Sequence, residues 1–365
     1  MNFKLNFKIK MSCVILTYSR QTKLDGIWAY QCFVATYTTV STARRPTPNA
    51  SNHQPSTMWS LAATMTLLAN NNPCQVIGLY RHAVKGLSAD ELTKVTLLNA
   101  GETFPDDRRF ALLQKENEAK FDASSPEWLH KENFLCAFSD PKLMSTFLST
   151  YNIVNAEGSR TEPCDTGSDE GAATTQRLLT IRDRASTDHL LGPVDLNNKQ
   201  GRDSVASFFS EKSGKDVVCV AGGSTSSSQQ HKHQFGNTSS GIKARGDTRT
   251  IHIVNAETVK DLASKIGVPL NPTRFRPNLV IEGLEAWKEF DWVGHQIQIG
   301  DAKISIIKQT VRCEGISVDP LDPENELDIP KLLMKEFPQY GPYFGVYGVV
   351  DEPGSMALGD EVNLL

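Results

Sequence analysis

Residues 309–320 read QTVRCEGISVDP, and residues 274–278 read RFRPN. In the first stretch, Cys313 directly follows Arg312 at the end of a strand-like run. In the second, two arginines and an asparagine flank a proline. A thiolate suits a soft or high-valent metal. Paired arginines suit phosphate or another oxyanion, because each planar guanidinium can donate two hydrogen bonds at once. Together the two stretches predict a metal held by a phosphorylated organic cofactor.

Cys313 is the leading candidate among seven cysteines. A lone cysteine is most often a small buried hydrophobic residue, but Arg312 would favour the thiolate, and the following glycine turn lets a ligand approach. Arg274, Arg276 and Asn278 are candidates for oxyanion binding, because the proline fixes the direction of its neighbours. The alternative is a surface ion-pair cluster with nearby glutamates.

Two further basic groups could reach the same ligand. Residues 106–110 read DDRRF at the start of an apolar strand, so either Arg108 or Arg109 could point inward, although such strings are usually solvated. Lys85 precedes a glycine at a turn and either meets a phosphate or is an exposed turn residue. His231 and His233 resemble a metal pair, but no third ligand accompanies them, and histidines on an irregular loop are more often solvated.

Composition describes an ordinary globular protein, and 365 residues suggest two domains. The net charge of −4 gives no reason to expect nucleic-acid binding. The odd number of widely spaced cysteines argues against a disulfide framework and for a reducing compartment. No apolar run reaches the roughly 20 residues that cross a bilayer. GxGxxG, Walker, HExxH and GxSxG motifs are all missing from the sequence.

Residues 1–73 differ from the rest of the chain. They carry a net charge of +6 against −10 for the remainder, and they are rich in serine and threonine. This is the composition of an organellar transit peptide. A disordered tail, or a translation start at Met58, would explain the same pattern. Ordered structure is expected to begin near Cys74.

From Cys74 onward the patterns predict a mainly β protein with a few helices. Helices are expected from Asp140–Pro141, over 202–212 and over 256–266, the last with Asn255 as N-cap and Gly267 at its end. Residues 156–175 and 221–246 are expected to be loops. Short strands separated by turns favour β-barrels over a doubly wound sheet, and they are predicted over 76–80, 92–99, 109–114, 279–282, 295–299, 303–312, 344–350 and 356–362.

With these motifs the chain resembles the MOSC-domain proteins, which are named after the C-terminal domain of molybdenum-cofactor sulfurases. The resemblance covers 76–362 and rests on motifs that occur in one order: Tyr80 with Val84-Lys85-Gly86, residues 104–110, Arg274-Phe275-Arg276-Pro277-Asn278, residues 289–294, Arg312-Cys313 with Val318-Asp319-Pro320, residues 344–347 and Gly359-Asp360-Glu361-Val362. It implies an N-terminal MOSC β-barrel domain over 74–185 and a MOSC β-barrel domain over 186–365, which follow the disordered or transit-like leader that the composition indicates over 1–73.

The resemblance also implies molybdenum cofactor (Mo-molybdopterin). The relatives closest in function are amidoxime-reducing components, in which the cysteine matching Cys313 is the protein ligand to molybdenum. The residues matching Lys85, Arg108 and Arg276 hold the pterin phosphate and its surroundings. Two departures concern the substrate: Ile316-Ser317 stands where the reductases have a threonine pair, and the loop over 221–246 is long and polar.

The resulting hypothesis is an oxidoreductase that reduces a small N-hydroxylated substrate. Cys313 would be the metal ligand, and Asp319 would orient the site or carry protons. Electrons would come from an external donor such as a cytochrome b5-type protein and its reductase. The resemblance places the protein inside the cell, in the cytoplasm or mitochondrion.

Two alternatives stay open at this point. The chain could be a carrier of cofactor or sulfur that uses Cys313 as a persulfide, in which case the pyridoxal phosphate module of a sulfurase would be another protein. It could also be a cofactor-free barrel that binds a small anion with its arginines.

Overall fold

The computed structural model describes residues 15–24, 27–36, 73–155, 158–160, 175–222, 234–236 and 249–365. The chain divides into two compact units, residues 1–68 and 69–365. In the first unit, β1 (Ile15–Leu24) and β2 (Ile27–Thr36) pair as an antiparallel hairpin. These strands precede Cys74, where the sequence predicted the first ordered element. The interpretation of 1–73 as a leader stays a prediction.

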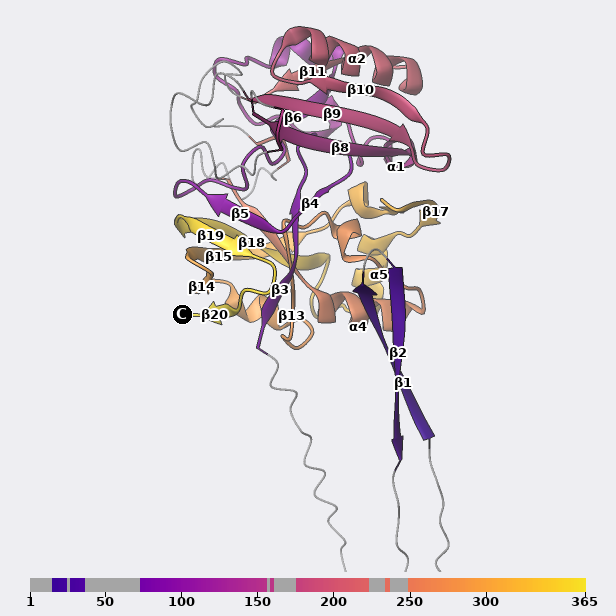
Figure 1. Cartoon of the computed structure of the whole chain (residues 1–365), viewed down its shortest axis with the longest axis vertical. Helices are drawn as coiled ribbons and strands as arrows, with labels where there is room; N and C mark the ends of the chain where they lie inside the picture. The colour runs from indigo at the N-terminus through magenta and orange to yellow at the C-terminus, as the bar shows by residue number, and fades with distance from the viewer. Residues whose placement is uncertain are drawn as a thin grey trace, which may run out of the picture. The chain divides into compact units, whose positions relative to one another are not determined.

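The centre of the second unit is an eight-stranded sheet with the order β20-β14-β15-β18-β12-β13-β3-β4 (Figure 1). All of its neighbours are antiparallel except the parallel pair β12–β13. Its strands are β3 (Gln75–Arg81), β4 (Asp90–Leu92), β12 (Ile251–Asn255), β13 (Leu279–Glu282), β14 (Gln296–Ile299), β15 (Ala302–Val311), β18 (Tyr343–Glu352) and β20 (Val362–Leu364).

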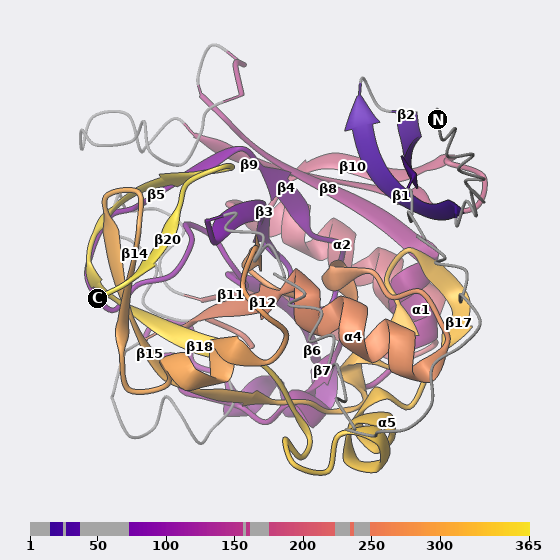
Figure 2. The same ribbon diagram turned by 90° about the horizontal axis from the view of Figure 1, so that it is seen from below.

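One hydrophobic core fills the space between this sheet and two helices, α4 (Ala256–Ile266) and α5 (Ile329–Glu336), which lie beside it in Figure 2. The core forms because buried and less buried residues alternate along β15, so one face of the strand is apolar. The α4 bounds match the prediction. The Asn255 side chain accepts from the backbone N–H of Glu257, and Gly267 ends the helix at φ 72°.

A second core lies under α2 (Lys199–Ser213), at the top of Figure 1. Val205 and Phe209 of α2 pack there with apolar residues of two three-stranded sheets. Those sheets are β10-β9-β8 and β11-β6-β7, with the bounds β6 (Phe110–Gln114), β7 (Phe134–Leu135), β8 (Phe147–Val154), β9 (Gln176–Asp183), β10 (His189–Asp195) and β11 (Val217–Ala221).

Smaller elements complete the unit. They are α1 (Pro141–Thr146), β5 (Lys94–Leu97) paired with β19 (Gly354–Ala357), and β16 (Val318–Asp319) paired with β17 (Asp322–Glu326). The predicted N-cap of α1 is confirmed, since the Asp140 carboxylate accepts from Leu143 N–H at 3.2 Å. No helix among the described residues is long and apolar enough to cross a membrane.

Strands dominate and helices are few, so the predicted fold class is confirmed, with the main sheet curled rather than doubly wound. Pairing crosses the predicted boundary at residue 185. β3 and β4 join the C-terminal sheet, while β11 pairs with β6. The division into 74–185 and 186–365 stays a prediction. The predicted loops over 156–175 and 221–246 lie mostly outside the described residues.

A buried carboxyl group sits where α4 meets the turn after β13. The side chain of Glu289 is fully buried and accepts hydrogen bonds from Asn255 Nδ2 at 3.1 Å and Thr258 Oγ1 at 2.8 Å. Burial raises its pKa to about 7, although the hydrogen bonds from Asn255 and Thr258 act in the other direction. The folded protein therefore holds a proton here that the unfolded chain loses near pH 4.5.

The stability of the protein should therefore fall as the pH rises from about 4.5 through 7, because ionising Glu289 in the folded state is unfavourable. Across this pH range the free energy of unfolding would fall by about 3 kcal/mol in total. Urea unfolding between pH 5 and 8 should show that Glu289→Gln flattens this dependence. Asp301→Asn, at an exposed carboxylate in the turn between β14 and β15, should leave it unchanged. Parallel pH curves for wild type and Glu289→Gln would contradict the expectation.

Candidate functional site

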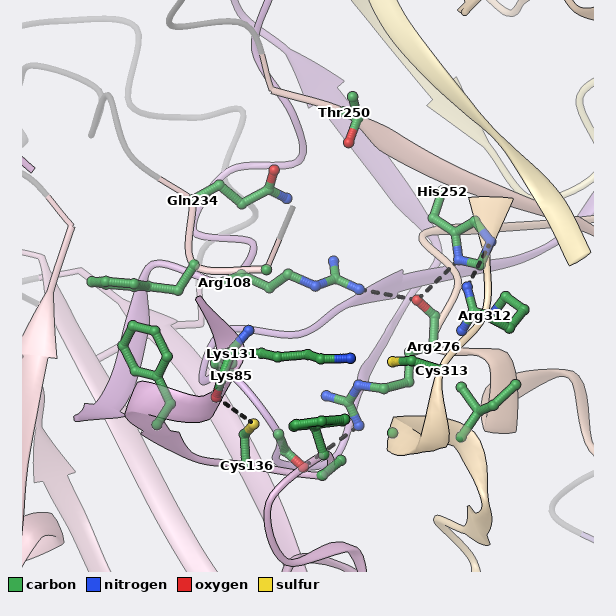
Figure 3. Close-up of a pocket in the computed structure, with 18 of the residues that line it drawn as sticks. Lys85, Arg108, Lys131, Cys136, Gln234, Thr250, His252, Arg276, Arg312 and Cys313 are labelled. Carbon is green, nitrogen blue, oxygen red and sulfur yellow. Dashed lines mark hydrogen bonds between the residues drawn. The ribbon is translucent and has the colours of Figure 1, made fainter. Parts of the chain in front are cut away.

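A cavity of about 400 Å³ lies in the second unit, beside the end of β15 (Figure 3). Segments far apart in the sequence line it, including the turn after β3, the stretch before and after β7, the turn before β13 and the end of β15. Among the predicted site residues, those that line it are Lys85, Arg108, Arg276, Asn278, Arg312 and Cys313.

The turn over 274–278 is built rigidly. Arg276 adopts the left-handed conformation (φ 52°, ψ 51°), which is uncommon for a residue with a Cβ. Its guanidinium donates to Leu87 O at 2.9 Å, and its carbonyl accepts from Arg108 Nη2 at 3.0 Å. Phe275 stacks on Phe344 at 3.9 Å between ring centroids. These contacts fix both the carbonyl and the guanidinium of Arg276 at the cavity.

Asn278 links two strands to the turn before β13 at the cavity lining. Its Nδ2 donates to Tyr80 O at 3.1 Å, and its Oδ1 accepts from His252 N at 3.1 Å. The side chain is fully buried. Asn278 therefore acts on the cavity by holding β3, β12 and the turn before β13 together.

Arg108 is held by a buried acidic partner behind the cavity wall. Its Nη1 lies 2.5 Å from Asp107 Oδ2, and Asp107 also accepts from Gln234 Nε2 at 2.6 Å. Phe235 N–H donates to Arg108 O at 2.8 Å. A Cβ at Gly236 would lie 2.4 Å from Arg108 Cδ, so only glycine lets this short segment approach so closely.

Arg312 and Cys313 follow β15 at the cavity mouth. Arg312 Nη2 donates to Phe275 O at 2.9 Å, and its Nη1 lies 3.4 Å from His252 Nε2. The buried Nε of Arg312 has no hydrogen-bond partner in the described part of the chain. Cys313 is exposed and precedes the short 3-10 helix η6 (Glu314–Ile316). The structure thus puts an accessible thiol next to a guanidinium that has spare hydrogen-bonding capacity.

Burial shapes the protonation of the groups around the cavity. It lowers the pKa of Lys85, an effect that nearby Arg108 and Arg276 reinforce and Cys136 opposes. Burial, together with the neighbouring Arg108 charge, lowers the pKa of Arg276 to about 10. Burial, reinforced by Arg312, also keeps the pKa of His252 well below its usual range, so this imidazole is neutral near pH 7. A bound anion would relieve the repulsion between these cations.

Three predicted residues are not brought to the cavity lining. Arg109 is buried and paired with Asp106 at 2.8 Å. Arg274 is fully buried, donates from Nε to Ile316 O at 2.9 Å and lies 3.6 Å from Asp319. Arg274 and Asp319 thus hold the backbone that follows Cys313, instead of facing the cavity themselves.

Three other cavity residues had no signal in the sequence. Lys131 and Cys136 come from a stretch without periodicity, and His252 comes from a buried strand. Tyr347 of β18 belongs to the 344–347 motif, but no role at the site was predicted for it. The His231 and His233 pair lies outside the described residues. Among the residues that are described, no group of three or more histidine, cysteine or acidic side chains could hold a metal ion.

Comparison with known proteins shows which family the chain is similar to. Residues 230–363, in the C-terminal part of the chain, match the family model of the MOSC domain. It is similar to human mitochondrial amidoxime-reducing component 1, with 32% identity over 33% of this chain and 39% of that protein. The mouse protein is 29% identical over 55% of this chain and 63% of its own length.

These alignments span less than two thirds of either relative. Similar solved structures include the YUAD protein from Bacillus subtilis, with 12% identity over 80% of this chain and 94% of that chain at a TM-score of 0.31. YiiM from Geobacillus stearothermophilus is 21% identical over 32% of this chain and 53% of its own, at a TM-score of 0.26. The resemblance to MOSC-domain proteins predicted from the sequence is confirmed.

Replacing Asn278 with alanine should destabilise the protein by about 2–3 kcal/mol, because it leaves Tyr80 O and His252 N–H without the side-chain partner each now has. Chemical denaturation measures this directly. Asn363→Ala, at an exposed position of β20, is the matched control and should change stability by less than about 0.5 kcal/mol. Equal effects of the two substitutions would contradict a bridging role for Asn278.

Proposed function

We propose that this protein binds molybdenum cofactor through Cys313 and reduces small N-hydroxylated compounds. One observation carries the proposal. An accessible thiol lines one cavity together with five lysine and arginine side chains, which are Lys85, Arg108, Lys131, Arg276 and Arg312. No carboxylate lines this cavity in the described part of the chain. The relatives are named amidoxime-reducing components, which agrees with this class of substrate.

The donor set suits the cofactor. A thiolate is a soft ligand of the kind that molybdenum would take, and arginine forks match phosphate. Arg312 Nε is buried without an acceptor, so an anion in the cavity could satisfy it. Cys313 would be the protein ligand to the metal, and Lys85, Arg108 and Arg276 would hold the phosphate and its surroundings. When bound, the cofactor would supply two-electron oxygen-atom transfer.

The protein's own contribution would be positioning and charge. Arg276 and Arg312 are already anchored to the carbonyls of Leu87 and Phe275, so they would meet the ligand without losing much side-chain freedom. Arg274 and Asp319 would act as positioning residues, because they hold the backbone of Ile316 and its neighbours next to Cys313. Arg109 would support Arg108 only indirectly, through the turn that both share.

The overall reaction breaks the N–O bond of the substrate, consumes two electrons and two protons, and releases the oxygen as water. We assign the electrons to an external donor, such as a cytochrome b5-type protein with its reductase, because the sequence carries no flavin or haem signature. The relatives are named as mitochondrial proteins, and together with the basic composition of residues 1–73 this supports a mitochondrial location.

Molybdenum content and activity test the proposal. Protein from a cofactor-producing host should contain about one molybdenum and one pterin per chain and should reduce N-hydroxybenzamidine with reduced viologen as donor. Cys313→Ala should cut activity by more than about 100-fold, since even the outer partners of metal ligands are worth 10–100-fold. Mass spectrometry of the metal and fluorescence of the oxidised pterin measure binding independently of activity.

Cys219→Ala is the control, because this buried thiol lies in the second core and away from the cavity. It should keep both metal and activity. Folded wild-type protein without metal or pterin would overturn the cofactor assignment. Loaded protein that reduces no N-hydroxylated compound would overturn the reaction, and a persulfide on Cys313 would then favour a sulfur carrier.

A further inference from the structure

The cavity has an outer wall that the cofactor proposal does not use. It is formed by residues 128–138, a stretch that includes the short 3-10 helix η2 (Lys131–Asn133) and β7. Aromatic groups dominate this wall. Trp128 meets His130 edge to face at 5.9 Å between ring centroids. Flat apolar surfaces of this kind pack well against an aromatic ligand.

Lys131 places a fixed positive charge on this wall. Its Nζ lies 3.6 Å from the centroid of the Phe138 ring. The face of an aromatic ring attracts an ammonium group but carries no net charge, so it does not neutralise the ammonium as a carboxylate would. No carboxylate pairs with Lys131 among the described residues, whereas Arg108, on the other side, has Asp107. Lys131 is therefore a positioned and uncompensated cation.

The wall that carries Lys131 faces the thiol. A Cβ built on Gly315 would lie 3.6 Å from Cys313 Sγ and 3.6 Å from Phe138 Cβ, so both residues border the same glycine. Figure 3 shows Lys131, Lys85 and Cys313 grouped around one space. A substrate reacting beside Cys313 would thus come within reach of the Lys131 charge.

The proposed reaction changes the charge of the ligand in this space. An N-hydroxyamidine is a weak base, because its oxygen withdraws electron density from the basic nitrogen, and it is neutral near pH 7. The amidine formed from it is a strong base and takes up a proton. A neutral substrate is thus converted to a cation near Lys131, a basic side chain of the lining to which the cofactor proposal gives no role.

We propose that Lys131 is a specificity residue that disfavours cationic ligands and so promotes release of the amidine product. The identity of the substrate in this inference rests on the proposed function. Discrimination between cationic and neutral ligands is a property of the cavity and can be measured without the reaction. Unlike charges within a few ångströms attract and like charges repel in a partly desolvated site. Lys131 should therefore weaken the binding of an amidine while leaving its neutral isostere unaffected.

The test compares benzamidine, a cation, with benzamide, a neutral molecule of the same shape. Dissociation constants are measured by calorimetry on the loaded protein, and inhibition constants in the reductase assay. In Lys131→Met, benzamidine should bind roughly tenfold more tightly than to wild type at low salt, with a smaller gain at high salt. Lys131→Glu should increase the gain, and Lys131→Arg should behave as wild type. Benzamide should bind equally to all four proteins.

Controls separate the outcomes. Lys335→Met removes an exposed lysine on α5 and should change nothing. Molybdenum content should be the same in every variant, so that a loss of cofactor is not mistaken for selectivity. Equal shifts for benzamidine and benzamide, or no shift for benzamidine, would overturn the role of Lys131. A failure to reduce any N-hydroxylated compound would overturn the proposed function instead, because the binding measurement still reports charge selection.

Discussion

The site depends on buried and partly buried guanidinium groups that donate to backbone carbonyls. Arg276 reaches Leu87 O, Arg108 reaches the carbonyl of Arg276, and Arg312 reaches Phe275 O. Arg274 holds Ile316 O in the same manner. Each bond ties a segment of the cavity to another that is distant in sequence. Removing a single arginine would therefore release a wall of the cavity as well as a charge.

This arrangement carries an electrostatic cost. Carbonyl oxygens accept hydrogen bonds from the arginines but offset only part of their positive charge. Burial disfavours the charge that remains, and together with the neighbouring cations it lowers the pKa of Arg276 and Lys85. Asp107 compensates from behind Arg108, outside the cavity. An anionic ligand would supply the missing negative charge. Binding of the ligand and stability of the cavity walls are thus linked.

Parts of the site could be predicted because local chemistry is visible in the chain. Arg312 next to Cys313, and the proline turn around Arg276, pointed to a thiol and oxyanion-binding groups, and the cavity gathers these residues. The sequence did not show which way each arginine side chain points. Arg108 faces the cavity while the adjacent Arg109 turns to Asp106. Arg108 lies in the turn before β6 and has a left-handed backbone conformation (φ 51°), which the sequence does not reveal. Arg274 and Arg276 likewise diverge.

The sequence by itself determined the mainly β fold, the bounds of α4 with its caps, the motifs of the MOSC domain and most of the basic residues of the site. Periodicity, capping and proline geometry are local properties, so they can be read without coordinates. Only the tertiary structure decided that β3 joins the C-terminal sheet and that Lys131 and Cys136 line the cavity. Those outcomes depend on long-range pairing and packing, which leave no periodic trace in the stretches concerned.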